Sequence, residues 1–481
     1  MSQLNREQID FIAMEVVSLL KGDVKIAEPA AVSSLPSDNP QSGQFPDIDS
    51  AVKAAHHAQR LLMEDTLDKR NRIIDAIRRK MLAHAEDLAA RAHAETGLGR
   101  KEDKVLKNRL VTEKTPGTEF LAPAAKSGDR GLMLIEPAPY GVIGTITPVT
   151  NPTSTIICNT IGMLAAGNAV VFNVHPSAKN VSLYNIHLLN QTVIEAGGPP
   201  NLITTVSNPT IESAQALMQH KDVRLLVVTG GTGVVREAMR SGKRAICAGP
   251  GNPPVVVDET ANIDLAAKSI IAGASLDNNI ICVDEKEVFV VQSVAGQLLD
   301  AFKKNGAVIL NETQINQLEK VIFAENKGPG KAAVMEKSLI GKNVSDILKN
   351  IGLSIPDHVR LAVAPVDSQH PLVWSEQMMP VLPVVKVSDA RTAIDLAVKA
   401  EHGFGHTAVM FSRNLDNLSR MARLINCSIF VKNGPSHAGL GHGGEGYCSF
   451  SIASPTGEGL TSPRSFSRER RCVLVDHFRI V

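Results

Sequence analysis

Three short segments carry residue types that could serve covalent catalysis and ligand binding. The first is AGASLDNNIICVDEKEV, in which Cys282 follows the polar residues Asp277, Asn278 and Asn279. A cysteine thiolate can act as a nucleophile, although a buried cysteine more often packs as a small hydrophobic residue. The sequence therefore offers Cys282 as a candidate nucleophile with a structural alternative.

Asn151 lies in the second segment, TPVTNPTST, between an expected strand end and a helix start. A side-chain amide at this position can donate a hydrogen bond to a developing oxyanion. It can equally cap the helix or form a turn before Pro152. Both roles remain open from the residues alone.

The third segment, VRLLVVTGGTGVVREAM, predicts a strand, a glycine-rich turn and a helix. Gly230, Gly231 and Gly233 would let a ligand approach the backbone closely, and the first N–H groups of the helix could bind a phosphate. The pattern is not GxGxxG, and a tight strand-to-helix turn explains the glycines equally well.

Composition excludes several other classes of protein. Fifty Lys and Arg balance 49 Asp and Glu, so the net charge of +1 provides no basic field for nucleic acid or an acidic membrane. Six cysteines in 481 residues are too few for a disulfide scaffold, and none has CxxC or zinc-type spacing. A reducing cytoplasm and no bound metal are expected, and no signal peptide is recognised.

Alternating strand and helix patterns position these segments. YGVIGTITP and AAGNAVVFNV predict strands around a buried helix, TSTIICNTIGML, and a second alternating block runs from PPVVVD to about residue 431. This alternation predicts an α/β fold with a doubly wound parallel sheet. Residues 137–178 carry no charge, but Pro, Asn and Gly interrupt them too often for a membrane-spanning helix.

The two ends of the chain differ from this alternating body. Residues 4–20 carry an apolar stripe at helical spacing, and residues 22–47 are rich in Pro, Ser, Ala and Gly without any period. We interpret them as a docking helix on a linker, or else as a frayed helix on its own domain. The C-terminal RCVLVDHFRIV predicts a strand that adds to a sheet, in cis or between subunits.

Six motifs, in this order and at these separations, resemble the aldehyde dehydrogenase superfamily. They are ITPVTNP, MLAAGNAVVFNVHPS, VTGGTG, AGPGNPPVVVD, IICVDE and SEQMMPVLPVVKV. Within this superfamily, three segments resemble the CoA-acylating aldehyde dehydrogenases of bacterial microcompartments, of the propanediol and ethanolamine utilisation type. These segments are FNVHPSAKN, EHGFGHTA and ASPTGEGLTSPRSFSRERRC. The N-terminal helix on its linker resembles the encapsulation peptides of that subgroup.

Two departures from the superfamily pattern bear on the reaction. The glutamate that activates water in hydrolytic members is replaced by Cys247, with no carboxylate nearby in sequence, and the ribose-binding lysine is absent, with His175 closest. The resemblance therefore implies NAD-dependent oxidation of a short-chain aldehyde, acetaldehyde or propionaldehyde, with CoA as acyl acceptor. The alternatives are a hydrolytic enzyme making free acid, a reductive NADPH enzyme like glutamyl-phosphate reductase, and a non-catalytic cargo or scaffold protein, which retention of Cys282 and Asn151 disfavours.

The resemblance also implies roles for individual residues. Cys282 would be the nucleophile and Asn151 the oxyanion donor, with His406, or else His402, as base for the CoA thiol, although either histidine could simply bond to backbone. Ile280 and Ile281 flank the nucleophile and suggest a small apolar substrate pocket. The expected cofactor-binding residues are Thr147, Pro148, His175, Pro176, Ser177, Thr229, Gly230, Gly231, Thr232 and Glu376.

The implied architecture is a Rossmann-type cofactor domain, an α/β catalytic domain and a β oligomerisation element. We place the docking helix at 1–21, the linker at 22–47 and the NAD and CoA domain at 48–245, with oligomerisation strands near 131–138. The catalytic domain would span 246–440, and residues 441–481 would return to the cofactor domain and form an oligomerisation tail. A dimer or tetramer in the microcompartment lumen, bound to a shell protein through residues 4–20, is expected.

Overall fold

The computed structural model describes residues 42–481, so the predicted docking helix and most of the predicted linker lie outside the described residues. The linker prediction is wrong for its last residues. Strand β1 (Gln44–Phe45) pairs in parallel with β6 (Ile203–Val206), and the Asp47 side chain caps helix α2 (Ile48–Glu64). A strand of two residues is too short to leave a periodic pattern in the sequence.

Six parallel strands form the first sheet, in the order β1-β6-β5-β4-β7-β8. Its central strands include β5 (Ala169–Asn173), β4 (Val142–Ile146) and β7 (Val223–Thr229), and β8 (Arg244–Ala248) forms the edge opposite β1. Strands β4 and β5 and the intervening helix α6 (Pro152–Ala165) are buried along their whole length. The uncharged stretch is therefore the core of a covered parallel sheet, as predicted.

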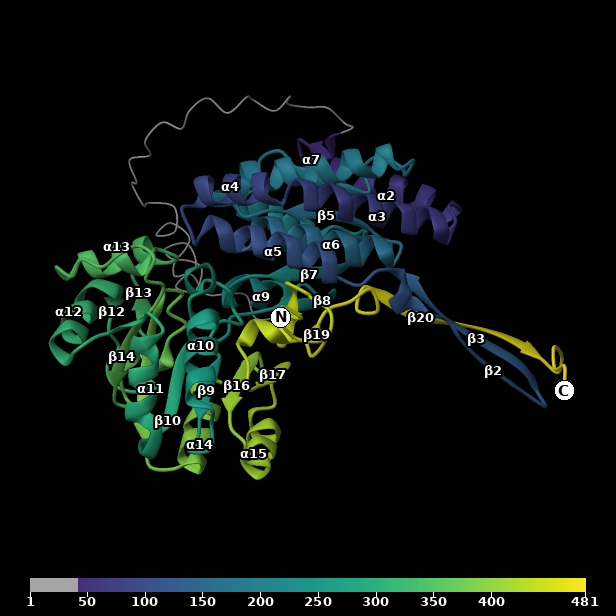
Figure 1. Cartoon of the computed structure of the whole chain (residues 1–481). Helices are drawn as coiled ribbons and strands as arrows, with labels where there is room; N and C mark the ends of the chain where they lie inside the picture. The colour runs from purple at the N-terminus through teal and green to yellow at the C-terminus, as the bar shows by residue number, and fades with distance from the viewer. Residues whose placement is uncertain (1–41) are drawn as a thin grey trace, which may run out of the picture. The chain divides into compact units, whose positions relative to one another are not determined.

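Helices cover both faces of this sheet (Figure 1). Helix α2 and helix α8 (Ile211–Gln219) contact each other and the sheet, whereas α6 packs with α7 (Lys179–Glu195) on the opposite side. An outer layer on α6 and α7 consists of α3 (Leu67–Ala83), α4 (Ala85–Thr96) and α5 (Lys101–Lys114). Helix α9 (Thr232–Arg240) packs against β7 and β8.

Seven parallel strands form the second sheet, in the order β11-β14-β15-β10-β9-β16-β17. They are β9 (Pro254–Val257), β10 (Glu287–Val291), β11 (Val308–Ile309), β14 (Ala362–Val366), β15 (Val381–Val387), β16 (Thr407–Phe411) and β17 (Ile429–Lys432). Their helices are α10 (Ile263–Ala274), α11 (Gln292–Lys304), α12 (Glu312–Ile322), α13 (Val344–Lys349), α14 (Ala390–Ala400) and α15 (Leu415–Ile425). Both sheets confirm the predicted α/β fold.

A short connection brings the two sheets together. Only residues 249–253 separate the end of β8 from the start of β9. The carboxyl edge of the first sheet therefore adjoins the amino edge of the second, since so few residues span little distance. The predicted division at residues 245 and 440 stays a prediction.

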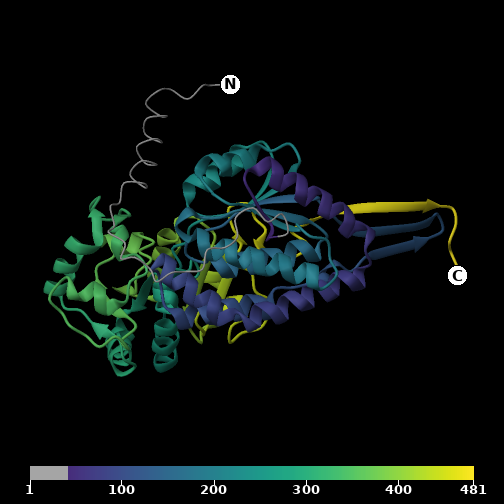
Figure 2. The same cartoon turned by 90° about the horizontal axis from the view of Figure 1, so that it is seen from above.

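A separate antiparallel sheet extends away from the rest of the described chain (Figures 1 and 2). It consists of β2 (Ala124–Gly128), β3 (Gly131–Pro139) and β20 (Ser467–Val475) in that order. β20 pairs with β3 over all of its residues, so the predicted C-terminal strand adds in cis. Val473, Leu474 and Val475 are nevertheless exposed on it.

Two smaller hairpins pair β12 (Phe323–Glu325) with β13 (Val334–Met335), and β18 (Ile452–Ala453) with β19 (Gly459–Leu460). Within residues 42–481, no helix combines the length and apolar character that crossing a bilayer requires.

Candidate active site

The predicted cofactor residues follow three neighbouring strands of the first sheet. Thr147 and Pro148 follow β4, residues 175–177 follow β5, and residues 230–232 follow β7. Because β5, β4 and β7 are adjacent and parallel, these residues meet at one carboxyl edge. Such an edge is where α/β proteins bind nucleotides, so the site fits a dinucleotide.

The turn after β7 leaves backbone N–H groups available to an anion. Helix α9 begins after Gly231 with no side-chain cap from the described residues, and Gly231 and Thr232 are exposed. Thr229 Oγ1 lies 3.2 Å from Ser451 Oγ, and that hydroxyl donates to Asn159 Oδ1 at 2.9 Å. No sequence pattern pointed to Ser451, because it comes from a segment that is distant along the chain.

His175 takes part in its own turn. Its Nδ1 accepts a hydrogen bond from the Ser177 N–H at 3.1 Å, and burial lowers the pKa of the imidazole. His175 is therefore neutral near pH 7 and supplies no fixed charge, while Pro176 and Ser177 are exposed to an incoming ligand.

Four residues far apart in sequence meet at the amino edge of the second sheet. Cys282 precedes β10, Gly251 precedes β9, Glu376 precedes β15 and His406 precedes β16. These strands are neighbours in the order β15-β10-β9-β16, so the residues before them converge. The nucleophile candidate thus lies on the edge that adjoins the nucleotide edge of the first sheet.

Gly251 holds this group together. A Cβ atom at Gly251 would lie 2.6 Å from the backbone oxygen of Cys282 and 3.1 Å from His406 Cγ, so a side chain does not fit. The Gly251 N–H donates to Glu376 Oε1 at 3.3 Å. Glu376 is therefore part of the site and not a solvated loop carboxylate, and burial raises the pKa of its carboxyl group.

Cys282 is the cysteine of this site and is partly accessible to solvent, whereas Cys158 and Cys247 are buried. Desolvation, together with the nearby Glu376 carboxylate, raises the pKa of the Cys282 thiol to about 12, and Lys286 acts in the opposite direction. Without a bound ligand, the thiol is therefore protonated near neutral pH.

His406 lies against this group but does not titrate near neutrality. Its Nδ1 is 2.8 Å from Thr407 Oγ1, its backbone N–H donates to Glu401 at 2.8 Å, and its Nε2 has no partner among the described residues. Burial lowers the pKa of His406 to about 4, and Lys286 contributes. The imidazole is thus neutral near pH 7 and a weaker base than the sequence suggested. His402 is exposed and contacts the Trp374 carbonyl at 2.9 Å.

Asn151 occupies the N-cap position of α6, but its side chain does not cap the helix. Its Oδ1 accepts a hydrogen bond from Lys107 Nζ at 2.7 Å, and its Nδ2 donates to Thr150 Oγ1 at 3.1 Å. An amide nitrogen carries two N–H groups, so one of them is available to a ligand. The geometry thus favours the donor role over the helix-cap alternative.

Ile280 and Ile281 are both buried. Ile280 lies close to Gly341, where an added Cβ would be 3.1 Å from Ile280 Cγ2, so this side chain faces a neighbouring loop. Their part in an aldehyde pocket stays a prediction.

No carboxylate is near Cys247 in sequence, but the fold brings one, Glu458, close to it in space. The Cys247 N–H donates to Thr456 Oγ1 at 3.0 Å, and that hydroxyl donates to Glu458. Burial raises the pKa of Cys247 to about 11, and Glu458 adds to the effect. Glu458 also lies 3.9 Å from Arg244. Sequence could not place Glu458 here because it is some 200 residues distant.

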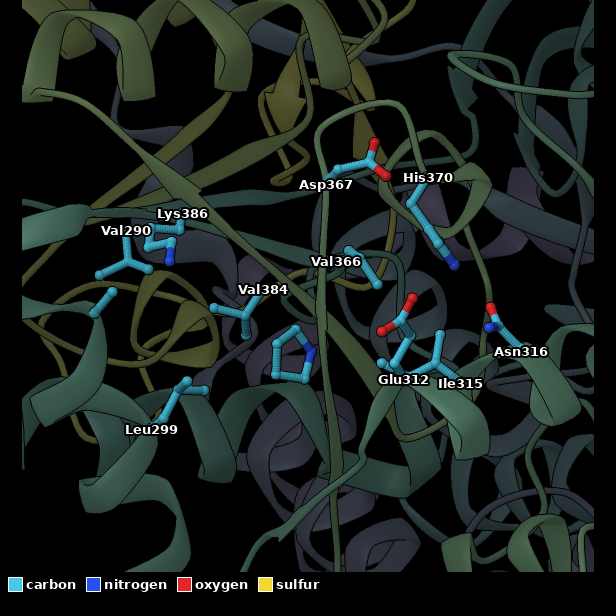
Figure 3. A pocket seen from close by; sticks show the side chains of 12 residues that line it. Val290, Leu299, Glu312, Ile315, Asn316, Val366, Asp367, His370, Val384 and Lys386 are labelled. Atoms are coloured by element: carbon cyan, nitrogen blue, oxygen red, sulfur yellow. The ribbon is translucent and has the colours of Figure 1, made fainter.

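The pocket shown in Figure 3 is separate from the group of residues around Cys282. Its volume is about 430 Å³, and it lies on the second sheet between α11 and α12. Its lining includes Lys386, Glu312, Asp367 and His370, but none of the residues around Cys282. In the part of the chain that the structure describes, no group of three or more His, Cys, Asp or Glu side chains is placed to hold a metal ion.

The raised thiol pKa predicts a pH profile for Cys282 in the ligand-free protein. Its alkylation by iodoacetamide should accelerate about tenfold per pH unit between about pH 7 and about pH 10, because only the thiolate reacts. Glu376→Gln removes a charge that raises this pKa, so the thiolate fraction and the rate should increase at fixed pH. The exposed Glu325→Gln is the control, and peptide mass spectrometry follows Cys282. A rate that levels off near neutrality would contradict the assignment.

Comparisons with known proteins agree with this geometry. The chain is 48% identical to acetaldehyde dehydrogenase (acetylating) EutE of Salmonella typhimurium, over 99% of this chain and 100% of that protein. A structure of Rhodopseudomonas palustris propionaldehyde dehydrogenase with bound CoA and an acylated cysteine has a TM-score of 0.88 and 48% identity, covering 90% of this chain and 98% of that one.

A propionaldehyde dehydrogenase from the Clostridium phytofermentans fucose utilisation bacterial microcompartment is also similar. Its TM-score is 0.88 at 45% identity, over 91% of this chain and 100% of that one. The model of the aldehyde dehydrogenase family matches residues 23–315, more than half of the chain. With a cysteine at the junction of two parallel sheets and a nucleotide edge beside it, the chain belongs to the aldehyde dehydrogenase family.

Proposed function

We propose that this protein is a CoA-acylating aldehyde dehydrogenase, which oxidises acetaldehyde or propionaldehyde with NAD and transfers the acyl group to CoA. The observation that carries the proposal is the placement of Cys282 against Gly251, at the edge that adjoins the nucleotide turns. The similarity to acylating enzymes over nearly the whole chain supports the same reaction.

Cys282 is the nucleophile in this proposal. The thiol first loses its proton to solvent, and the thiolate sulfur then adds to the aldehyde carbonyl. The resulting oxyanion accepts hydrogen bonds from the free Asn151 N–H and the Cys282 backbone N–H. Bound NAD supplies the hydride acceptor. The acyl group then stays on the Cys282 sulfur as a thioester until the sulfur of CoA displaces it.

His406 is proposed to receive the proton of the CoA thiol. Its Nε2 is neutral and unpartnered among the described residues, and its ring touches Gly251 beside Cys282. Glu376 and the residues after β4, β5 and β7 are proposed to bind NAD, with Ile280 and Ile281 near the aldehyde. Cys247 replaces the carboxylate that hydrolysis requires, and Glu458 bonds to Thr456 and Arg244.

Measuring NADH formation with acetaldehyde, propanal and butanal, with and without CoA, tests this function. Sustained turnover should require CoA, and mass spectrometry should find acyl-CoA with little free acid. Rapid CoA-independent formation of acid would support the hydrolytic alternative instead. Acetaldehyde and propanal should differ modestly, since one methylene changes binding by about 1 kcal/mol.

We also propose an oligomer inside a microcompartment. The exposed Val473, Leu474 and Val475 on the extended sheet would be covered by a second copy, giving a dimer or tetramer. The apolar stripe of residues 4–20 would bind a shell protein, and its segment precedes the described fold.

Deleting residues 1–41 should leave turnover within about twofold of the full chain, because the described fold begins after them. The same deletion should abolish co-purification with microcompartment shells. A deletion of residues 1–46 is the matched control, since it also removes β1 and should lower the melting temperature. Loss of activity in the shorter deletion would place the helix in the enzyme core and remove support for the shell address.

A further inference from the structure

A buried ion-pair network joins the Asn151 amide to the loop that precedes Cys282. Lys107 Nζ donates to Asn151 Oδ1 at 2.7 Å and also pairs with the Asp277 carboxylate, five residues before Cys282. We propose that Lys107 is a positioning residue, which orients and polarises the Asn151 amide and couples it through Asp277 to the nucleophile loop. The inference rests on the proposed role of Asn151.

The hydrogen bonds fix which way the amide points. Lys107 has no acceptor atoms, so only Oδ1 of Asn151 can face it, and Nδ2 must turn toward the opposite side. One N–H of Nδ2 donates to Thr150 Oγ1, and this bond fixes the direction in which the second N–H points. A neutral side chain with an acceptor atom in place of Lys107 could accept a hydrogen bond from Nδ2, so the Asn151 amide could flip.

The charge of Lys107 also strengthens the amide as a donor. A cation bound to the amide oxygen draws electron density from the nitrogen, so the free N–H becomes a better donor to an oxyanion. Lys107 is almost fully buried, and little water screens this effect.

The same network shapes the loop that leads to Cys282. Asp277, Asn278 and Asn279 have φ angles of 46°, 57° and 66°, an unusual run of left-handed residues that needs external support. The Asp277 carboxylate accepts from the Arg100 N–H at 2.7 Å, and a Cβ on Gly99 would collide with it at 1.9 Å. Lys107 therefore contacts both the Asn151 amide and the Asp277 carboxylate, which stabilises this loop.

Lys104 provides a matched comparison within the same network. Its Nζ lies 2.9 Å from the same Asp277 oxygen and is as buried as that of Lys107, but its hydrogen-bond partner is Asp277 and not Asn151. Desolvation lowers the pKa of Lys104 to about 8, and the adjacent Lys107 adds to the shift. Loss of either lysine weakens the Asp277 support, and only loss of Lys107 releases the amide.

The test compares Lys107→Met with Lys104→Met, each in the natural chain and in an Asn151→Ala background. Turnover with aldehyde, NAD and CoA, KM for NAD and melting temperature are measured. In the natural chain, Lys107→Met should lower kcat by about 10- to 100-fold with KM for NAD nearly unchanged, and Lys104→Met by less than about fivefold. In the Asn151→Ala background, adding Lys107→Met should lower kcat by a further factor of less than about three.

Two results would overturn the proposal. One is an equal loss in kcat for both lysine variants, and the other is an undiminished effect of Lys107→Met once Asn151 is absent. If Lys107→Met does not fold, Thr150→Val releases the other end of the amide without touching the ion pairs. It should slow turnover severalfold, and this effect should also vanish in the Asn151→Ala background.

Failure of the proposed function would look different. If Asn151→Ala alone left kcat unchanged, the oxyanion role itself would be wrong, whatever the lysine variants did. If Asn151→Ala was severe but additive with Lys107→Met, only the positioning role would be wrong.

Discussion

Cys282→Ala is expected to abolish acyl transfer to CoA while the protein stays folded. Alanine lacks the sulfur that would hold the acyl group, so no thioester can form for CoA to resolve. Cys282 is not fully buried and alanine removes only one heavy atom, so the substitution creates little cavity. NADH and acyl-CoA formation measure the effect, and the melting temperature and NAD binding report the fold.

Cys472→Ala is the matched control, since Cys472 is a free and exposed cysteine on β20, far along the chain from the site. It should retain full activity. If Cys282→Ala kept more than about 1% of the turnover, another nucleophile would carry the reaction, and Cys247 would be examined next.

Asn151→Ala is expected to lower kcat by about 100- to 1,000-fold, the usual cost of losing one oxyanion donor. The free N–H is absent in the variant, whereas the nucleotide turns after β5 and β7 are untouched. KM for NAD should therefore change little. A loss confined to KM would mean that Asn151 binds substrate in the ground state and does not stabilise the transition state.

The asparagine variant also leaves the Lys107 ammonium buried without its amide partner. Its melting temperature must therefore be recorded beside kcat, so that a structural loss is separated from the loss of a donor. Asn151→Asp keeps the shape and a partner for Lys107 but removes the N–H donors, and it should be about as slow as Asn151→Ala.

The sequence predicted the sheets because buried parallel strands leave a strong signal. The uncharged run through β4, α6 and β5 indicated a covered core, and the alternation from β9 to β17 indicated a second parallel block. Strand β1 was missed because two residues carry no period, and the linker was drawn too long as a result.

The candidate site was predicted in part. Cys282, Asn151 and Glu376 came from motif order, since each lies in a local segment that can be read alone. Gly251 was not singled out, because glycine is required there only once the Cys282 carbonyl packs against it in the fold. The nearness of Glu458 to Cys247 likewise depends on how a distant segment folds back.

The low pKa of His406 shows a further limit. Its residue type suggested near-neutral titration, but burial and Lys286 determine the value, and neither is visible in the EHGFGHTA motif. Lys107 gave no signal either, because a lysine on a charged helix is usually solvated and α5 carries several. Only the fold shows that it is buried against Asn151.

The most direct test traps the acyl group on the protein. Enzyme, propanal and NAD are mixed without CoA, quenched in acid and digested, and the peptides are identified by mass spectrometry. The peptide containing Cys282 should carry a propionyl group in an amount that approaches one per chain, and adding CoA before the quench should remove it as propionyl-CoA. An unmodified Cys282 peptide during NADH formation, or an acyl group on another residue, would contradict the central claim.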